Sequence, residues 1–150
     1  FGAVDEDAMG WGVSVAGRVK VNEGGDDIRF SVTGGEGIGR YIGLNATNAA
    51  TLDIDGSLDP IASYGGLIAY RHVNENGSRF NFGYSGLFVD NDDAVTGNPV
   101  ESVQSVYGAY LWDVAPKVTM GAELLYGLRE LQSGADGDMT RFTFSTKYAF

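Results

Sequence analysis

The stretch MTRFTFSTKYAF at residues 139–150 alternates between two kinds of side chain. One set of alternate positions carries all the aromatic rings and consists of Phe142, Phe144, Thr146, Tyr148 and Phe150, whereas the other consists of Arg141, Thr143, Ser145 and Lys147. A two-residue period is typical of a β-strand with one apolar and one polar face. The stretch therefore predicts an amphipathic strand.

Earlier stretches show the same alternation, and the sequence contains no heptad pattern or sustained 3.6-residue stripe. Together they predict strands at 9–21, 28–33, 61–73, 79–89, 102–112, 117–129 and 139–150. The connections are short at 22–27, 74–78 and 113–116 and longer at 34–60, 90–101 and 130–138. Short turns at one end of a meander and long loops at the other are typical of outer-membrane barrels. We therefore expect residues 1–150 to be part of one all-β domain, an antiparallel up-and-down transmembrane β-barrel.

The composition excludes several classes of protein. Among 150 residues there are 20 acidic and 10 basic side chains, one histidine and no cysteine. The acidic excess argues against a nucleic-acid partner, which needs positive charge. A single histidine without cysteine leaves little material for a Ser-His-Asp or zinc site. We therefore expect no enzyme activity, no cofactor and no metal site.

The positions of the charges indicate which face of the sheet is wet. Of the twenty acids only Glu123 lies within a predicted strand, and of the ten cations only Arg40 lies in a loop. The strand cations are Arg18, Lys20, Arg29, Arg71, Arg79, Lys117, Arg129, Arg141 and Lys147. Where alternation is clean, they lie opposite the aromatic face. Soluble sheets mix both signs on a solvated face, so this bias favours a water-filled pore that attracts anions, with the rings toward lipid.

The 27-residue connection at 34–60 is a candidate for a segment that narrows such a pore. It would present Arg40 and Tyr41 to the passing solute. The alternative is a disordered surface loop.

Two features predict that the sequence is the carboxy-terminal part of a larger barrel. Seven strands is an odd number, whereas single-chain bacterial barrels have an even number. The aromatic face formed by Phe142, Phe144, Tyr148 and Phe150 also resembles the terminal strand that the barrel-assembly machinery recognises in outer-membrane proteins.

Two longer stretches resemble the carboxy-terminal half of DcaP-like porins. They are GRVKVNEGGDDIRFSVTGGEGIGRYIGLN at 17–45 and VTMGAELLYGLRELQSGADGDMTRFTFSTKYAF at 118–150, with the most distinctive parts at Gly37–Ile42 and Gly121–Glu130. The resemblance implies a sixteen-stranded barrel that assembles as a homotrimer in the lipid of the bacterial outer membrane. It also implies passive uptake of small anions, dicarboxylates above all. The strands that precede this part in the family, and its amino-terminal periplasmic segment, are not in the sequence.

The leading hypothesis is thus an anion-selective channel whose path is formed by Arg18, Arg29, Arg71, Arg79 and Arg141. Two alternatives remain open. One is a soluble β-barrel binding module whose rings line an apolar ligand cavity, and the other is a structural barrel with a plugged lumen. The channel hypothesis requires Phe82, Leu124 and Phe144 to face away from the cations and not to form a dry centre.

Overall fold

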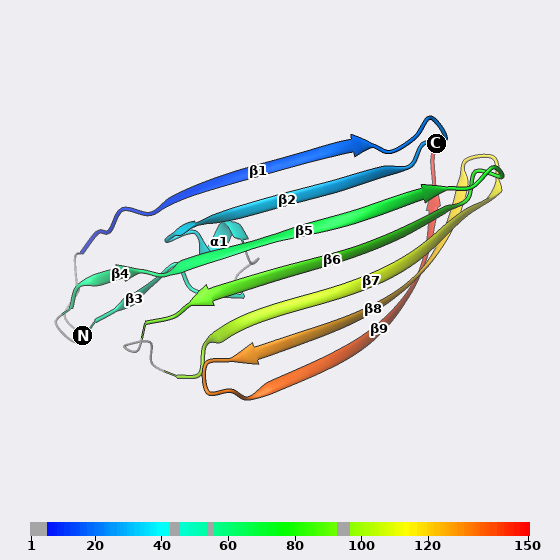
Figure 1. Cartoon of the computed structure of the whole chain (residues 1–150). Coiled ribbons are helices and arrows are strands. Elements are labelled where there is room, and N and C mark those ends of the chain that lie inside the picture. The colour runs from blue at the N-terminus through cyan, green and yellow to red at the C-terminus, as the bar shows by residue number, and fades with distance from the viewer. Residues whose placement is uncertain (1–5, 43–45, 54–55, 93–96) are drawn as a thin grey trace.

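The computed structural model describes residues 6–42, 46–53, 56–92 and 97–150, and its main feature is a curved antiparallel sheet (Figure 1). Neighbouring strands of this sheet follow one another along the chain. They are β1 (Trp11–Lys20), β2 (Asp27–Glu36), β5 (Ala62–Val73), β6 (Arg79–Asp90), β7 (Val100–Ala115), β8 (Val118–Leu131) and β9 (Asp136–Tyr148). The predicted all-β, up-and-down antiparallel topology is confirmed.

The segment between β2 and β5 holds the remaining elements, a short helix α1 (Gly39–Ile42) and a small two-stranded sheet of β3 (Ala50–Leu52) and β4 (Leu58–Pro60). Within the described ranges, no helix has the length and apolar character that crossing a bilayer requires.

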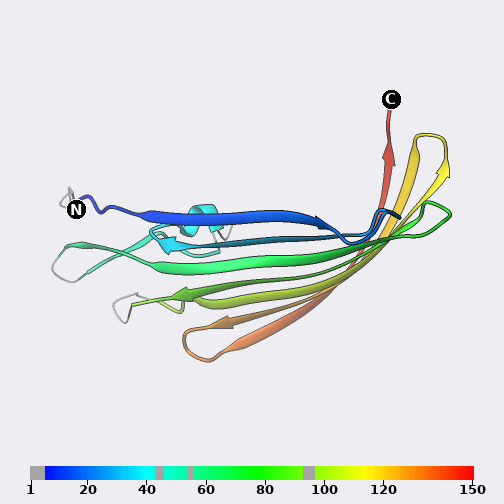
Figure 2. The same ribbon diagram turned by 45° about the horizontal axis from the view of Figure 1, so that its top comes forward.

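Helix α1 lies over one face of the large sheet, which we call the inner face (Figure 2). Ile42 of α1 packs there against a small buried cluster of Ile61, Leu87 and Val89. Because side chains alternate along a strand, the opposite, outer face is fixed by the register. It carries the rings of Trp11, Phe30, Tyr64, Tyr70, Phe80, Phe82, Tyr84, Phe88, Tyr110, Trp112, Tyr126, Phe142, Phe144 and Tyr148.

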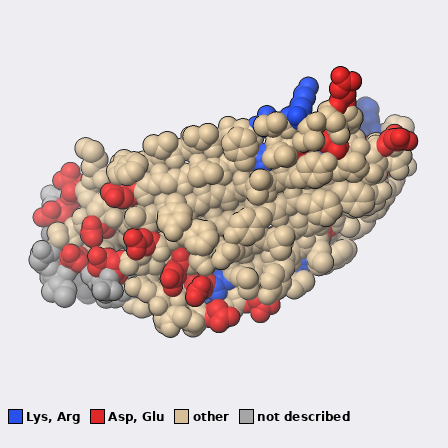
Figure 3. All heavy atoms as spheres, viewed as in Figure 1, with Lys and Arg blue, Asp and Glu red and all other residues tan. Residues whose placement is uncertain are grey.

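The outer face leaves large apolar side chains uncovered. Phe82, Leu124 and Phe144 are each more than half exposed, so these three side chains do not form a dry centre. The face turned to the viewer in Figure 3 has a broad zone with few charges across its middle and acidic side chains gathered at its left end. A contiguous apolar surface that extends across several strands is typical of a face that contacts lipid or a protein partner.

Strand β2 is longer than predicted, because it continues through 34–36, where glycines had suggested a loop. A Cβ atom on Gly35 would overlap the carbonyl oxygen of Trp11, so glycine allows β1 to approach closely. The glycines at 34–35 therefore belong to the sheet.

The prediction of a long loop at 130–138 is wrong. Strand β8 continues to Leu131, β9 begins at Asp136, and a four-residue turn joins them. In this turn the N–H of Leu131 donates to the carbonyl of Ala135 at 2.9 Å, and Gly134 adopts a φ of 78°. Asp136 and Asp138 had suggested a loop. Both lie in β9, where every residue is exposed, so their charges remain in contact with solvent.

The sheet is open. Within the described residues, β1 pairs only with β2 and β9 pairs only with β8, which leaves one edge of each strand without a neighbour. Because seven strands alternate in direction, the two edge strands run the same way along the sheet.

Candidate functional site

The cations predicted to share a face do so. Eight of the nine lie in strands of the large sheet, at positions that the register assigns to the inner face. They are Arg18, Lys20, Arg29, Arg71, Arg79, Arg129, Arg141 and Lys147. The ninth, Lys117, lies in the turn before β8 with a φ of 69° and was wrongly included in a strand.

The inner-face cations gather toward one end of the strands. Arg18, Lys20, Arg29, Arg71, Arg79 and Lys147 lie toward the end where short turns join β1 to β2, β5 to β6 and β7 to β8. Arg129 and Arg141 lie toward the opposite end, at the β8–β9 turn. This distribution agrees with the sequence-based prediction.

Three arginines of this group surround one buried carboxylate. Asp27, the first residue of β2, accepts Arg29 Nε at 2.8 Å on Oδ1, while Arg18 and Arg71 approach Oδ2 at 2.8 and 2.7 Å. Asp27 has no accessible surface, whereas the side chains of Arg18 and Arg29 remain about half exposed. We call Asp27 with its three arginines the Asp27 cluster. The carboxylate is the buried part of the cluster, and the guanidinium groups form its accessible surface.

The Asp27 cluster arises directly from strand pairing. Arg18 lies opposite Arg29 across β1 and β2, and Asp27 lies opposite Lys20 on one side and Arg71 on the other. Arg71 also donates from NH2 to the carbonyl of Gly25 at 3.1 Å. Each arginine therefore reaches Asp27 from an adjacent position in the register.

Two more inner-face arginines have acidic neighbours. Arg79 NH2 lies 3.8 Å from Asp113 Oδ1, which also accepts a hydrogen bond from Thr119. Arg141 NH2 lies 3.4 Å from Glu123 Oε1. Asp113 had been predicted to lie in a turn, whereas Glu123 had been predicted to lie in a strand, and the strand alternation alone paired neither acid with its arginine. All five arginines of the predicted anion path therefore have a resident carboxylate partner.

The inner face nevertheless keeps a positive surplus. Its register positions hold eight cations and three acids, Asp27, Asp113 and Glu123, which leaves a formal surplus of five positive charges. No ion pair involves Lys20, Arg129 or Lys147 within the part of the chain that the structure describes. The charge of these three cations is therefore not neutralised by any carboxylate of the described residues.

The segment with α1 lies over the inner face, where the sequence had offered Arg40 and Tyr41 as groups that narrow a pore. Both side chains are exposed, Tyr41 by 85%. A hollow of about 550 Å³ lies between this segment and the sheet, lined by Tyr41 and Ile42 on one side and by Ser31, Thr33 and Ser85 on the other. Residues 43–45 and 54–55 of the segment are outside the described ranges.

A second buried carboxylate joins two turns at the same end of the sheet. Asp26, before β2, accepts hydrogen bonds from Asn22 Nδ2 at 2.9 Å, Tyr70 Oη at 2.7 Å and the N–H of Val73 at 2.8 Å. His72 Nδ1 lies 3.0 Å away. These hydrogen bonds, that of His72 foremost, hold the pKa of Asp26 well below its ordinary range. The single histidine thus has a structural partner.

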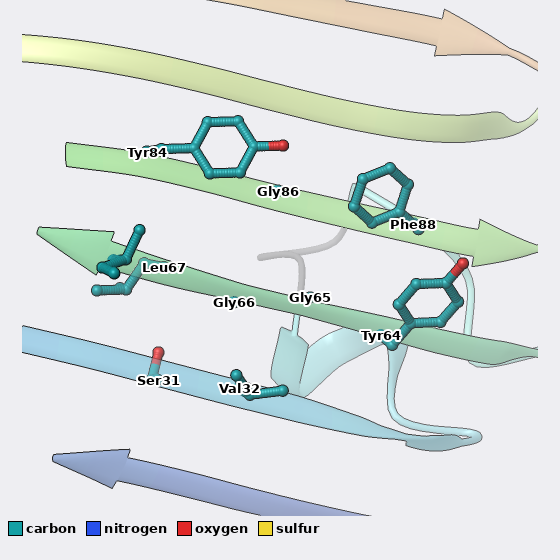
Figure 4. Close-up of a pocket in the computed structure, with 10 residues that line it drawn as sticks. Ser31, Val32, Tyr64, Gly65, Gly66, Leu67, Tyr84, Gly86 and Phe88 are labelled. Atoms are coloured by element: carbon teal, nitrogen blue, oxygen red, sulfur yellow. The ribbon is translucent and has the colours of Figure 1, made fainter.

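The outer face has its own shallow hollow, over β2, β5 and β6 (Figure 4). Gly66 and Gly86 pair across β5 and β6 at its floor, and the rings of Tyr64, Tyr84 and Phe88 border it. The hollow measures about 320 Å³. Because it lies on the face opposite the cations, it is not part of the charged surface.

The residues predicted to form an assembly signal are exposed. Phe142, Phe144 and Tyr148 project from the outer face of β9, and Phe150 follows that strand with its ring 6.1 Å from that of Tyr148. Each of the four is more than half exposed, although the ring of Phe144 lies 6.3 Å from that of Trp112.

Comparisons with known proteins agree with this architecture. No protein-family model and no curated protein matches the sequence. Among solved structures, the chain is similar to the crystal structure of the outer membrane channel DcaP of Acinetobacter baumannii, with a TM-score of 0.88 at 20% sequence identity. The match covers 98% of this chain and 42% of the DcaP chain. The predicted resemblance to DcaP-like porins is therefore confirmed at the level of the fold, and this chain has the fold of part of the DcaP channel.

Proposed function

We propose that the chain is one part of a larger transmembrane β-barrel in a bacterial outer membrane, where it lines a passive diffusion channel. The observation that carries the proposal is the division of the sheet into two faces. Eight cations and the α1 segment share the inner face, whereas exposed aromatic rings cover the outer face. The apolar side chains of the outer face would contact lipid, and the charged side chains of the inner face would contact water inside the barrel.

The positive surplus supports selectivity for anions, and the substrate class that we propose is small carboxylates and dicarboxylates. A carboxylate about 4 Å from a cation gains ~1 kcal/mol in water-like surroundings and ~4 kcal/mol at an effective dielectric near 20. Several contacts of this strength in series raise the local anion concentration without trapping the solute. The proposed path runs from Arg129 and Arg141 at the long-loop mouth to the Asp27 cluster, Arg79, Lys20, Lys117 and Lys147 at the short-turn end.

The remaining partners follow from the same barrel. Bilayer lipid contacts the outer face, and the barrel-assembly machinery recognises the exposed rings at Phe142, Phe144, Tyr148 and Phe150. Three copies form a homotrimer. Arg40 and Tyr41 narrow the mouth from the α1 segment. A soluble binding module is less well supported, because the rings of the outer face are exposed and border only a shallow, open hollow.

The test is a planar-bilayer measurement on the complete barrel protein in a KCl gradient. We expect a reversal potential of the sign given by chloride permeation, and we expect succinate to enter liposomes faster than a neutral sugar of similar size. A reversal potential of the opposite sign would refute anion selectivity. The absence of any conductance would refute the channel.

A further inference from the structure

Asp27 is a buried acid among the cations at the short-turn end of the inner face. It has no accessible area, although it lies on an open face of the sheet, because three guanidinium groups cover it. A carboxylate so placed occupies the position that a carboxylate solute would take.

The Asp27 cluster keeps a net positive charge. Three arginines and one aspartate leave a formal charge of +2, and Lys20 lies directly opposite Asp27 in the register. Without Asp27, the three guanidinium groups would face one another with no anion between them. They would then hold the first multivalent anion that arrived, since a charge-assisted pair between guanidinium and carboxylate is among the stronger hydrogen-bonded contacts in proteins.

The geometry shows which donors remain for a solute. Arg29 engages Asp27 through Nε, and Arg18 does so through NH2. Among the described residues, these two half-exposed side chains form no ion pair except with Asp27, which leaves their other donors for a solute. A passing anion therefore meets guanidinium groups that are held in place and partly neutralised.

We propose that Asp27 is an internal counter-ion, which sets how tightly the Asp27 cluster holds a passing multivalent anion and so keeps the path conducting. The inference rests on the proposed function as an anion channel. Asp27 is a specificity-determining residue that acts through the three arginines.

The experiment compares the wild-type complete barrel with the Asp27→Asn variant in planar bilayers, with succinate as the probe added to KCl. We expect Asp27→Asn to shift the reversal potential further toward that of chloride. We also expect succinate to reduce the chloride current at a concentration at least about fivefold lower, the change that corresponds to ~1 kcal/mol for one uncompensated unit charge near the solute.

Glu123→Gln is the matched control. It removes the same unit of charge from the inner face, but it frees one arginine, Arg141, at 3.4 Å and not three. We expect its effect on succinate block to be clearly smaller than that of Asp27→Asn. If the two variants changed succinate block equally, Asp27 would have no role that Glu123 lacks, and the inference would be overturned.

A second comparison keeps the test decisive if Asp27→Asn alone does not assemble. Arg29→Gln lowers the charge of the Asp27 cluster by one, and the double variant Asp27→Asn/Arg29→Gln restores it to the wild-type value. We expect the double variant to be at least about fivefold more sensitive to succinate than Arg29→Gln alone. Equal sensitivity would overturn the inference.

The outcomes separate the two proposals. A wild-type channel that prefers cations would refute the proposed function itself. An anion-selective wild type whose succinate block is unchanged by Asp27→Asn would refute only the role of Asp27.

Discussion

Tyr70 Oη donates a hydrogen bond of 2.7 Å to Oδ2 of Asp26, which lies 44 positions earlier in the sequence. The bond ties the end of β5 to the turn between β1 and β2. The carboxylate of Asp26 also accepts the N–H of Val73 and so binds both hairpins. The short-turn end of the sheet is therefore held by side chains as well as by the backbone ladder.

Replacing Tyr70 by phenylalanine removes one donor to a carboxylate and leaves the ring in place. We expect Tyr70→Phe to lower the urea midpoint of the folded barrel, followed by tryptophan fluorescence. Tyr84→Phe is the matched control, because Tyr84 donates at 2.7 Å to the neutral side chain of Gln104 on the exposed outer face. Hydrogen bonds to charged groups contribute more than neutral ones. A smaller loss for Tyr70→Phe than for Tyr84→Phe would contradict this role.

The lowered pKa of Asp26 predicts how stability depends on acidity. The folded state keeps Asp26 ionised to lower pH than the unfolded chain does, because His72, Tyr70 and the N–H of Val73 hydrogen-bond the carboxylate. The stabilisation is therefore present above about pH 4, the ordinary aspartate pKa, and is lost as the pH falls below it.

We expect Asp26→Asn to lower the urea midpoint at pH 6 and to narrow the difference in midpoint between pH 6 and pH 3. Asp138→Asn, which removes an exposed carboxylate of β9, is the control. A pH dependence that Asp26→Asn leaves unchanged would show that other groups govern acid stability.

The contact between the α1 segment and the inner face predicts a change in conductance. Ile61 is 3% exposed and packs with Leu87 and Val89. Truncating a buried isoleucine to alanine costs about 2–5 kcal/mol, which here weakens the attachment of the segment to the sheet. We expect Ile61→Ala to raise single-channel conductance in KCl or to broaden its distribution.

Leu52→Ala is the control for Ile61→Ala, because Leu52 lies in the same segment but is 51% exposed. We expect this change to leave the conductance near that of the wild type. If both variants conduct like the wild type, the segment does not restrict the path.

The cations without an acidic partner give a further prediction. Lys147→Gln removes an inner-face charge that forms no ion pair within the described ranges. We expect it to lower the ratio of anion to cation permeability, measured from the reversal potential, by up to about fivefold. Glu23→Gln changes one charge in the turn after β1 and should not lower this ratio. A ratio unchanged by Lys147→Gln would place Lys147 outside the anion path.

The sequence was sufficient to predict the strands and their faces, because the two-residue alternation of side chains is visible within each strand and does not depend on which strands pair. Arg141 and Phe142 on β9, for example, lie on the faces that alternation assigned. Strand ends were harder, since glycine and aspartate have low strand propensity. Gly35 lies in β2 because it permits close approach to Trp11, and Asp136 begins β9 after a turn only four residues long.

The partners of the charged side chains could not be predicted from alternation. The sequence shows Asp26 and Asp27 as two neighbouring acids in one turn. The structure gives them opposite surroundings, because successive side chains of an extended segment point to opposite sides. Asp27 meets arginines from β1 and β5, whereas Asp26 meets Tyr70 and His72. Finding these contacts requires the register between strands, which no local pattern contains.

The shared direction of the two edge strands, β1 and β9, limits what can complete this wall. If two copies lay side by side in the same orientation, β9 of one copy would lie next to β1 of the other, and these two strands run in the same direction. A tandem duplication of the unit could therefore not close into a fully antiparallel barrel. Whatever closes the wall must supply an odd count of strands. In an engineered fusion that is meant to close this wall, the number of added strands should therefore be made odd before the lengths of those strands are chosen.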